Sequence, residues 1–152
     1  MMKSKRFEPI QEIASSSAKD LSRPMVEAAK KVADLEQQLK QLQHYRDEYV
    51  RNSTQGNGTM DAVKLQNYRS FLDRLGEAMR QQQKNLEIAR AEYEQRRAQW
   101  SEKRVEAESL SKVVDRFRKE EQRATDRREQ HDSDEAAARA ALATRRELSG
   151  AS

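Results

Sequence analysis

The sequence predicts an all-α protein, built as a long antiparallel two-helix coiled-coil hairpin in a single domain over residues 1–152. The first observation is an apolar row between residues 65 and 117, in which every step is three or four residues. The second is a similar row between residues 21 and 49, and the third is a polar, glycine-bearing stretch that separates the two rows. Rows with this alternation keep facing one partner helix when two helices supercoil.

The first helix is expected over about residues 8–52. Pro9 suits its first turn, where the missing N–H costs nothing, and residues 1–6 are expected to be a frayed basic tail. Pro24 lies in the interior, where proline kinks a helix, so we expect a bend or restart near residues 22–24. The apolar seam of this helix consists of Leu21, Met25, Ala28, Val32, Leu35, Leu39, Leu42, Arg46 and Tyr49.

A turn is expected over residues 53–60, because Asn52 to Gly58 carries two of the chain's four glycines between polar residues. Thr59 or Asp61 can cap the second helix, which is expected over about residues 61–146. Its seam consists of Leu65, Tyr68, Leu72, Leu75, Met79, Gln82, Leu86, Ala89, Tyr93, Arg96, Trp100, Lys103, Ala107, Leu110, Val114 and Phe117. Residues 136–148 have helical propensity but little to bury, so we expect them to fray until a partner binds.

The position of the turn also predicts which levels of the two helices face each other. If the turn centres near Asn57, Tyr49 lies beside Leu65, and Phe7 reaches only the level of Ala107. The second helix would then extend well past the first.

The composition limits what such a chain can be. Hydrophobic residues make up 35% and charged residues 37% of the 152 residues, against ordinary values of roughly 45–50% and about 25%. Both signs of charge are abundant and the periodicity is regular, which favours long solvated helices over a globular core. There is no cysteine, which excludes disulfides and thiolate chemistry. We find no secretory signal and no apolar run of membrane-spanning length, so we expect a cytoplasmic protein.

Catalysis is not expected. The four glycines form no phosphate-binding loop, and no Gly-Lys-Ser/Thr motif is present. His44 and His131 are isolated and show no metal-ligand spacing. We therefore expect neither an enzyme, nor a cofactor, nor a metal site.

Three groups of residues are candidates for binding a partner. The tip consists of Phe7, Ile10, Ile13, Leu110, Val113, Val114 and Phe117. The strip consists of Phe71, Leu75, Ala78 and Gln82. The basic stripe consists of Arg90, Arg97 and Arg104, which recur every seven residues.

Each group also has a purely structural interpretation. The tip either forms a small end-cap or enters another protein, since an exposed apolar patch usually marks an interface. Phe71 lies one position off the seam, near Gly76, and either broadens the seam or docks a partner. The basic stripe either forms solvated ion pairs or faces an acidic partner.

Four short patterns occur in order along the chain. They are Arg6-Phe7-x-Pro9-Ile10, Leu39-x-x-Leu42-x-x-Tyr45-Arg46-x-Glu48-Tyr49, Asn67-Tyr68-x-x-Phe71-Leu72-x-x-Leu75, and Trp100 followed by Lys103-Arg104. This order, around a turn of this length, resembles the FliJ family of the bacterial flagellar type III export apparatus over about residues 6–145. The resemblance implies a non-enzymatic coiled coil similar to the γ-subunit stalk of rotary ATP synthases.

The resemblance also implies partners: the hexameric export ATPase FliI, the export gate protein FlhA and export chaperones. The tip would bind the ATPase ring and promote its assembly and activity, while the strip would couple it to the gate protein. The family has a histidine where this chain has Gln82. The implied location is the cytoplasmic face of the inner membrane at the flagellar base, without membrane insertion and without a nucleic-acid partner.

Two other classes of function stay open. One is a general secretion chaperone or coiled-coil scaffold, which would bind export substrates one to one. The other is a peripheral binder of nucleic acid or anionic membrane through the basic stripe, with an affinity that falls steeply with salt. Nucleic acid is the less favoured ligand, because aromatic residues are not interleaved with the arginines.

Overall fold

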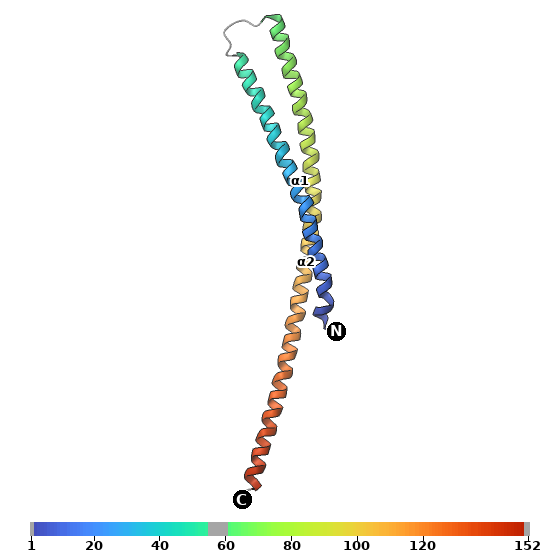
Figure 1. The fold of residues 1–152 in the computed structure, drawn as a ribbon, viewed down its shortest axis with the longest axis vertical. Helices are drawn as coiled ribbons and strands as arrows, with labels where there is room; N and C mark the ends of the chain where they lie inside the picture. The colour runs from blue at the N-terminus through green and yellow to red at the C-terminus, as the bar shows by residue number, and fades with distance from the viewer. Residues whose placement is uncertain (1, 55–60, 151–152) are drawn as a thin grey trace. The chain divides into compact units, whose positions relative to one another are not determined.

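The computed structural model describes residues 2–54 and 61–150. Two helices, α1 (Lys3–Thr54) and α2 (Ala62–Gly150), account for nearly all of these residues and pair as a helical hairpin (Figure 1). The predicted all-α class is therefore confirmed. The chain divides into two compact units: the first comprises Met1–Ser16 with Arg104–Ser152, and the second comprises Ser17–Lys103. Each unit is described by itself below.

Helix α2 begins with the cap that the sequence predicts. The backbone N–H of Lys64 donates to Oδ1 of Asp61 at 2.7 Å, and the N–H of Leu65 donates to the carbonyl oxygen of Asp61 at 3.0 Å. Asp61 thus satisfies an N–H of the first turn that has no partner within the helix. The alternative cap, Thr59, and most of the predicted turn lie outside the described residues.

Helix α1 begins earlier than expected and is not interrupted. Residues 3–6 are helical rather than a frayed tail, because Ser4 is held by α2. The helix also continues through Pro24, so the chain does not restart near residue 22. Proline removes one hydrogen bond from the ladder, but Leu21 and Met25 are partly buried on either side of it. Their packing outweighs the lost bond.

In the second unit, α1 and α2 run antiparallel along the predicted seam (Figure 1). Ala28 and Leu39 of α1 are buried, as are Leu75, Leu86 and Ala89 of α2. The other seam residues of this unit are partly buried, apart from the exposed Arg46, Leu65 and Arg96. The apolar seam is therefore confirmed as the contact between the helices.

The predicted register near the turn is wrong. The ring of Tyr49 stacks on Tyr68, with centroids 5.5 Å apart, and also contacts Phe71 at 4.3 Å. Leu65, the expected neighbour of Tyr49, is exposed. The partner level is thus roughly one helical turn further along α2. The aromatic rings explain the difference, because they bury large areas and favour pairing with one another.

The register expected for the first unit is also wrong, by a larger amount. Phe7 packs against Phe117, with ring centroids 5.3 Å apart, rather than lying level with Ala107. This is roughly three helical turns further along α2. Helix α1 therefore covers α2 as far as about Glu121, whereas α2 was expected to extend beyond it from about Ala107. From Asp126 onward every described residue of α2 is exposed, and residues 136–148, which were expected to fray, are helical.

Gly76→Ala should stabilise the protein, although a glycine inside a helix suggests a need for close packing. A Cβ at this position would meet only Nη1 of Arg80, at 3.7 Å, which is an ordinary van der Waals contact. Alanine is favoured over glycine in a helix interior by about 0.8–1.0 kcal/mol. Urea unfolding followed by circular dichroism should show a gain of this size.

The matched control is Ala78→Gly, at an exposed position of the same helix, which should lose a similar amount of stability. A Gly76→Ala protein less stable than wild type would show that the glycine is needed for packing.

Candidate functional site

The tip residues lie together in the first unit, but they differ in exposure. Val114 is only 3% exposed, and the half-buried rings of Phe7 and Phe117 face each other at an angle of 45°. Ile10 and Ile13 are 49% and 68% exposed. Leu110 and Val113 are partly buried. The end-cap interpretation therefore describes the inner tip residues, while Ile10 and Ile13 offer an apolar surface to solvent.

Polar contacts fasten the start of α1 beside these rings. The N–H and the hydroxyl of Ser4 both donate to the carboxylate of Glu121, at 3.0 and 2.6 Å. Arg118 donates through Nη2 to Oε1 of Glu8 at 2.7 Å, and Lys3 lies over the ring of Phe117 at 5.6 Å. These contacts join residues more than a hundred positions apart in the sequence.

The same contacts perturb two ionisation equilibria. The hydroxyl and backbone hydrogen bonds from Ser4 hold the pKa of Glu121 below its ordinary value of 4.5, with help from the charges of Arg118 and Lys5. The hydrogen bond to Glu8 raises the pKa of Arg118. Glu121 and Arg118 are therefore both charged at neutral pH.

The strip lies in the second unit, and α1 contributes to the same surface. Phe71 packs against Tyr45 and Tyr49, with ring centroids 5.9 and 4.3 Å apart. Leu75 is only 7% exposed, so it belongs to the seam, whereas Ala78 is exposed. Phe71 therefore broadens the seam and lies at the edge of a surface that also includes Ala78.

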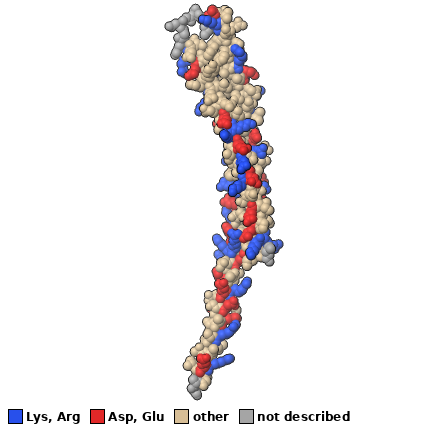
Figure 2. Space-filling model, viewed as in Figure 1, with Lys and Arg blue, Asp and Glu red and all other residues tan. Residues whose placement is uncertain are grey.

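Sequence reasoning missed the α1 half of this surface. Nε2 of Gln82 donates to Oε1 of Gln38 at 2.6 Å. A shallow groove beside this bond is lined by Gln38, Gln41, Leu42, Tyr45 and Gln82. Figure 2 shows mostly uncharged atoms over the ends of α1 and α2 that are cyan and green in Figure 1. The sequence did contain an indication of this α1 half. Gln38 and Tyr45 are seven residues apart, which places both on one side of the α1 seam.

The two sides of the seam differ in chemistry. The charged flank is defined as the residues that directly follow seam residues and form ion pairs between the two helices. These ion pairs join Glu8 to Arg118 and Glu36 to Arg90. We call the uncharged flank the uncharged residues that directly precede seam residues on the other side at the tip and at the strip, namely Ile10 and Val113 in the first unit and Gln38, Tyr45, Phe71 and Ala78 in the second. Elsewhere on this side Lys31, Glu92 and Glu106 hold the same kind of position, so the side is uncharged only in part. The exposed tip and strip residues thus include members of the uncharged flank in both units.

The basic stripe belongs to the charged flank. Nη2 of Arg90 lies 3.1 Å from Oε1 of Glu36, across the helix pair. Arg97 is exposed, and Arg104 is exposed and has an interaction within the chain. For Arg90 the structural interpretation, a solvated ion pair, is the one the structure shows.

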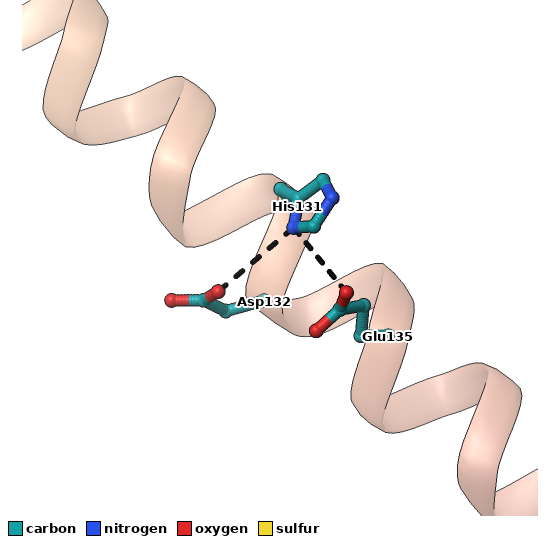
Figure 3. A group of neighbouring side chains, drawn as sticks. All are labelled: His131, Asp132 and Glu135. Carbon is teal, nitrogen blue, oxygen red and sulfur yellow. Dashed lines mark ion pairs between the residues drawn. The ribbon is translucent and has the colours of Figure 1, made fainter.

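Three possible metal ligands meet on α2, although the sequence suggested that His131 is isolated. Nδ1 of His131 lies 4.0 Å from Oδ1 of Asp132 and 3.8 Å from Oε1 of Glu135 (Figure 3). All three side chains are exposed and come from one helix. The i, i+4 spacing of His131 and Glu135 is an ordinary arrangement for a surface ion pair. The cluster therefore needs no metal to explain it.

The described residues form a two-helix antiparallel coiled coil with exposed apolar residues in both units. None of their helices is long and apolar enough to cross a membrane. The class defined by this fold is a two-helix coiled-coil protein.

The chain belongs to the FliJ family, because the model of that family, described as flagellar FliJ protein, matches residues 2–146. It is therefore a component of flagellar biogenesis and protein export. The comparisons with curated proteins and with solved structures gave no match. The likeness to the stalk of rotary ATP synthases accordingly stays a prediction from the family resemblance.

The hydrogen bonds to Glu121 predict a specific pH dependence. A carboxyl whose pKa is lowered on folding stabilises the folded state above its unfolded pKa, and this contribution is lost as the pH falls through the folded pKa. For Glu121 the loss should occur below pH 4.5. A carboxyl-detected NMR titration should place the Glu121 midpoint below 4.5 in wild type and closer to it in Ser4→Ala. A wild-type midpoint at or above 4.5 would contradict the assignment.

Proposed function

We propose that the chain is a non-enzymatic coupling factor that binds the export ATPase FliI through its tip and the gate protein FlhA through its strip. It would promote assembly and activity of the ATPase ring, and it would cycle export chaperones at the cytoplasmic face of the inner membrane. Membership of the FliJ family supports the export role. The observation that supports the finer assignment is the exposure of Ile10 and Ile13 in the first unit and of Tyr45 and Ala78 in the second.

The case for the tip rests on Ile10 and Ile13. Both are large, apolar and about half exposed or more, on a helix pair that is otherwise densely charged. Exposed apolar side chains that gather in one place mark interaction sites more often than scattered ones do. Because Val114 and the two phenylalanine rings hold the helices together beneath them, the surface is supported by packed residues.

The case for the strip rests on the aromatic cluster and its polar neighbours. Tyr45 is 52% exposed although its ring contacts Phe71. Tyrosine is favoured at protein interfaces, because it joins a large apolar ring to a polar hydroxyl. Gln38 and Gln82 add amide groups at the edge of the same surface. This combination suits a protein partner better than a nucleic acid.

Two exposed substitutions test the two contacts separately. Ile13→Asp should weaken binding to the purified ATPase and its stimulation at least tenfold, while binding to the cytoplasmic part of the gate protein is unchanged. Ala78→Glu should weaken binding to the gate protein at least tenfold, while binding to the ATPase and its stimulation are unchanged. Both positions are exposed, so helicity and thermal stability should stay near wild type. Val114→Asp is a poor probe, because it would put a carboxylate between the helices.

Ile88→Asp is the matched control, since Ile88 is 67% exposed and belongs to neither surface. It should leave both interactions intact. An equal loss of binding to both partners in all three variants would contradict the proposal. So would a wild-type protein that binds neither partner. One-to-one binding of export substrates without any effect on the ATPase would favour the chaperone alternative.

A further inference from the structure

The first turn of α1 lacks a cap of its own. The first N–H groups of a helix have no partner within it, and the positive end of the helix dipole favours a nearby negative charge. The first turn of α1 contains no acidic residue. Its nearest carboxylate in sequence, Glu8, is bonded to Arg118.

Helix α2 supplies the missing group. One carboxylate oxygen of Glu121 accepts from the backbone N–H of Ser4 at 3.0 Å, and the other accepts from the Ser4 hydroxyl at 2.6 Å. Ser4 is only 4% exposed and is the one buried polar residue among those described. A carboxylate that accepts from a first-turn N–H acts as an N-cap, here provided by the opposite helix.

The charges around Glu121 match this role. Lys5 of α1 and Arg118 of α2 both favour its ionised form, and the Ser4 hydrogen bonds do so most strongly. The adjacent contacts of Phe7 with Phe117 and of Glu8 with Arg118 lie within the next two turns of α1. Three neighbouring contacts therefore hold the start of α1 on α2: the hydrogen bonds of Ser4, the ring contact of Phe7 and the ion pair of Glu8.

We propose that Glu121 is a positioning residue, which caps α1 from α2 and so holds Ile10 and Ile13 in the arrangement that the ATPase binds. The second half of this statement rests on the proposed function of the tip. If the start of α1 separates from α2, Ile10 and Ile13 leave the α2 tip residues. A partner that needs both helices then binds with an apparent affinity equal to its intrinsic affinity multiplied by the fraction of molecules that stay paired.

Amide hydrogen exchange tests the cap without any partner. In Glu121→Ala the amides of residues 6–10 should exchange about tenfold faster or more, as expected for local opening, whereas the amides of residues 39–49 should be unaffected. Glu120→Ala is the matched control, because Glu120 is the exposed neighbour on the same helix. Glu121→Gln keeps an acceptor but loses the charge, so its exchange rates should be intermediate.

ATPase binding tests the positioning role. Glu121→Ala should weaken binding of the export ATPase in proportion to the loss of the paired fraction, which the exchange protection of residues 6–10 measures, and Glu121→Gln should restore part of it. Unchanged exchange in both variants would overturn the cap, and complete loss of exchange protection at residues 6–10 with unchanged binding would overturn the positioning role. If wild type does not bind the ATPase, the proposed function fails, and the exchange comparison alone decides whether Glu121 holds α1.

Discussion

The packing of one narrow apolar seam against another is the constraint on which the rest of the structure depends. A helix in a two-helix pair can bury only one stripe of its surface, and an isolated helix has little stability of its own in water. Buried apolar residues are accordingly few in the described ranges, where four of the eight are alanines. All remaining faces meet water, which explains why charged residues outnumber hydrophobic ones. Any surface for a partner must therefore lie along the edges of the seam.

This constraint explains what the sequence could and could not predict about the fold. The three-four spacing predicts the seam, because only helices that face each other keep it over many turns. Apolar residues recur at every third or fourth position, so a pairing shifted by one such step, or by several, still places apolar residues opposite apolar residues. Register must then be decided by particular contacts, such as Tyr49 with Tyr68 and Glu8 with Arg118. Those contacts are not visible in the repeat, and the predicted register was wrong.

The candidate site was predictable to a similar degree. Phe71 was found because it departs from the seam, and Ile10 because it belongs to an apolar patch near the chain's start. Gln38 and Tyr45, the α1 neighbours of the strip, were missed, since a pairing across helices depends on register. Ser4 was placed in a frayed tail and Glu121 beyond the end of the predicted seam, because polar residues at seam positions normally weaken it. In the structure they bond to each other, and the hairpin extends to include them.

The proposed contact between the exposed tip residues of the first unit and the export ATPase can be tested directly by cross-linking. The chain has no cysteine, so a single cysteine carrying a photo-crosslinker can replace Ile13 or, as the matched site, Ile88. The two positions are 68% and 67% exposed, so their reactivity should be equal without a partner. With the hexameric ATPase, the account predicts cross-links from position 13 and few from position 88. Equal cross-linking from both positions, or cross-linking from position 88 alone, would contradict it.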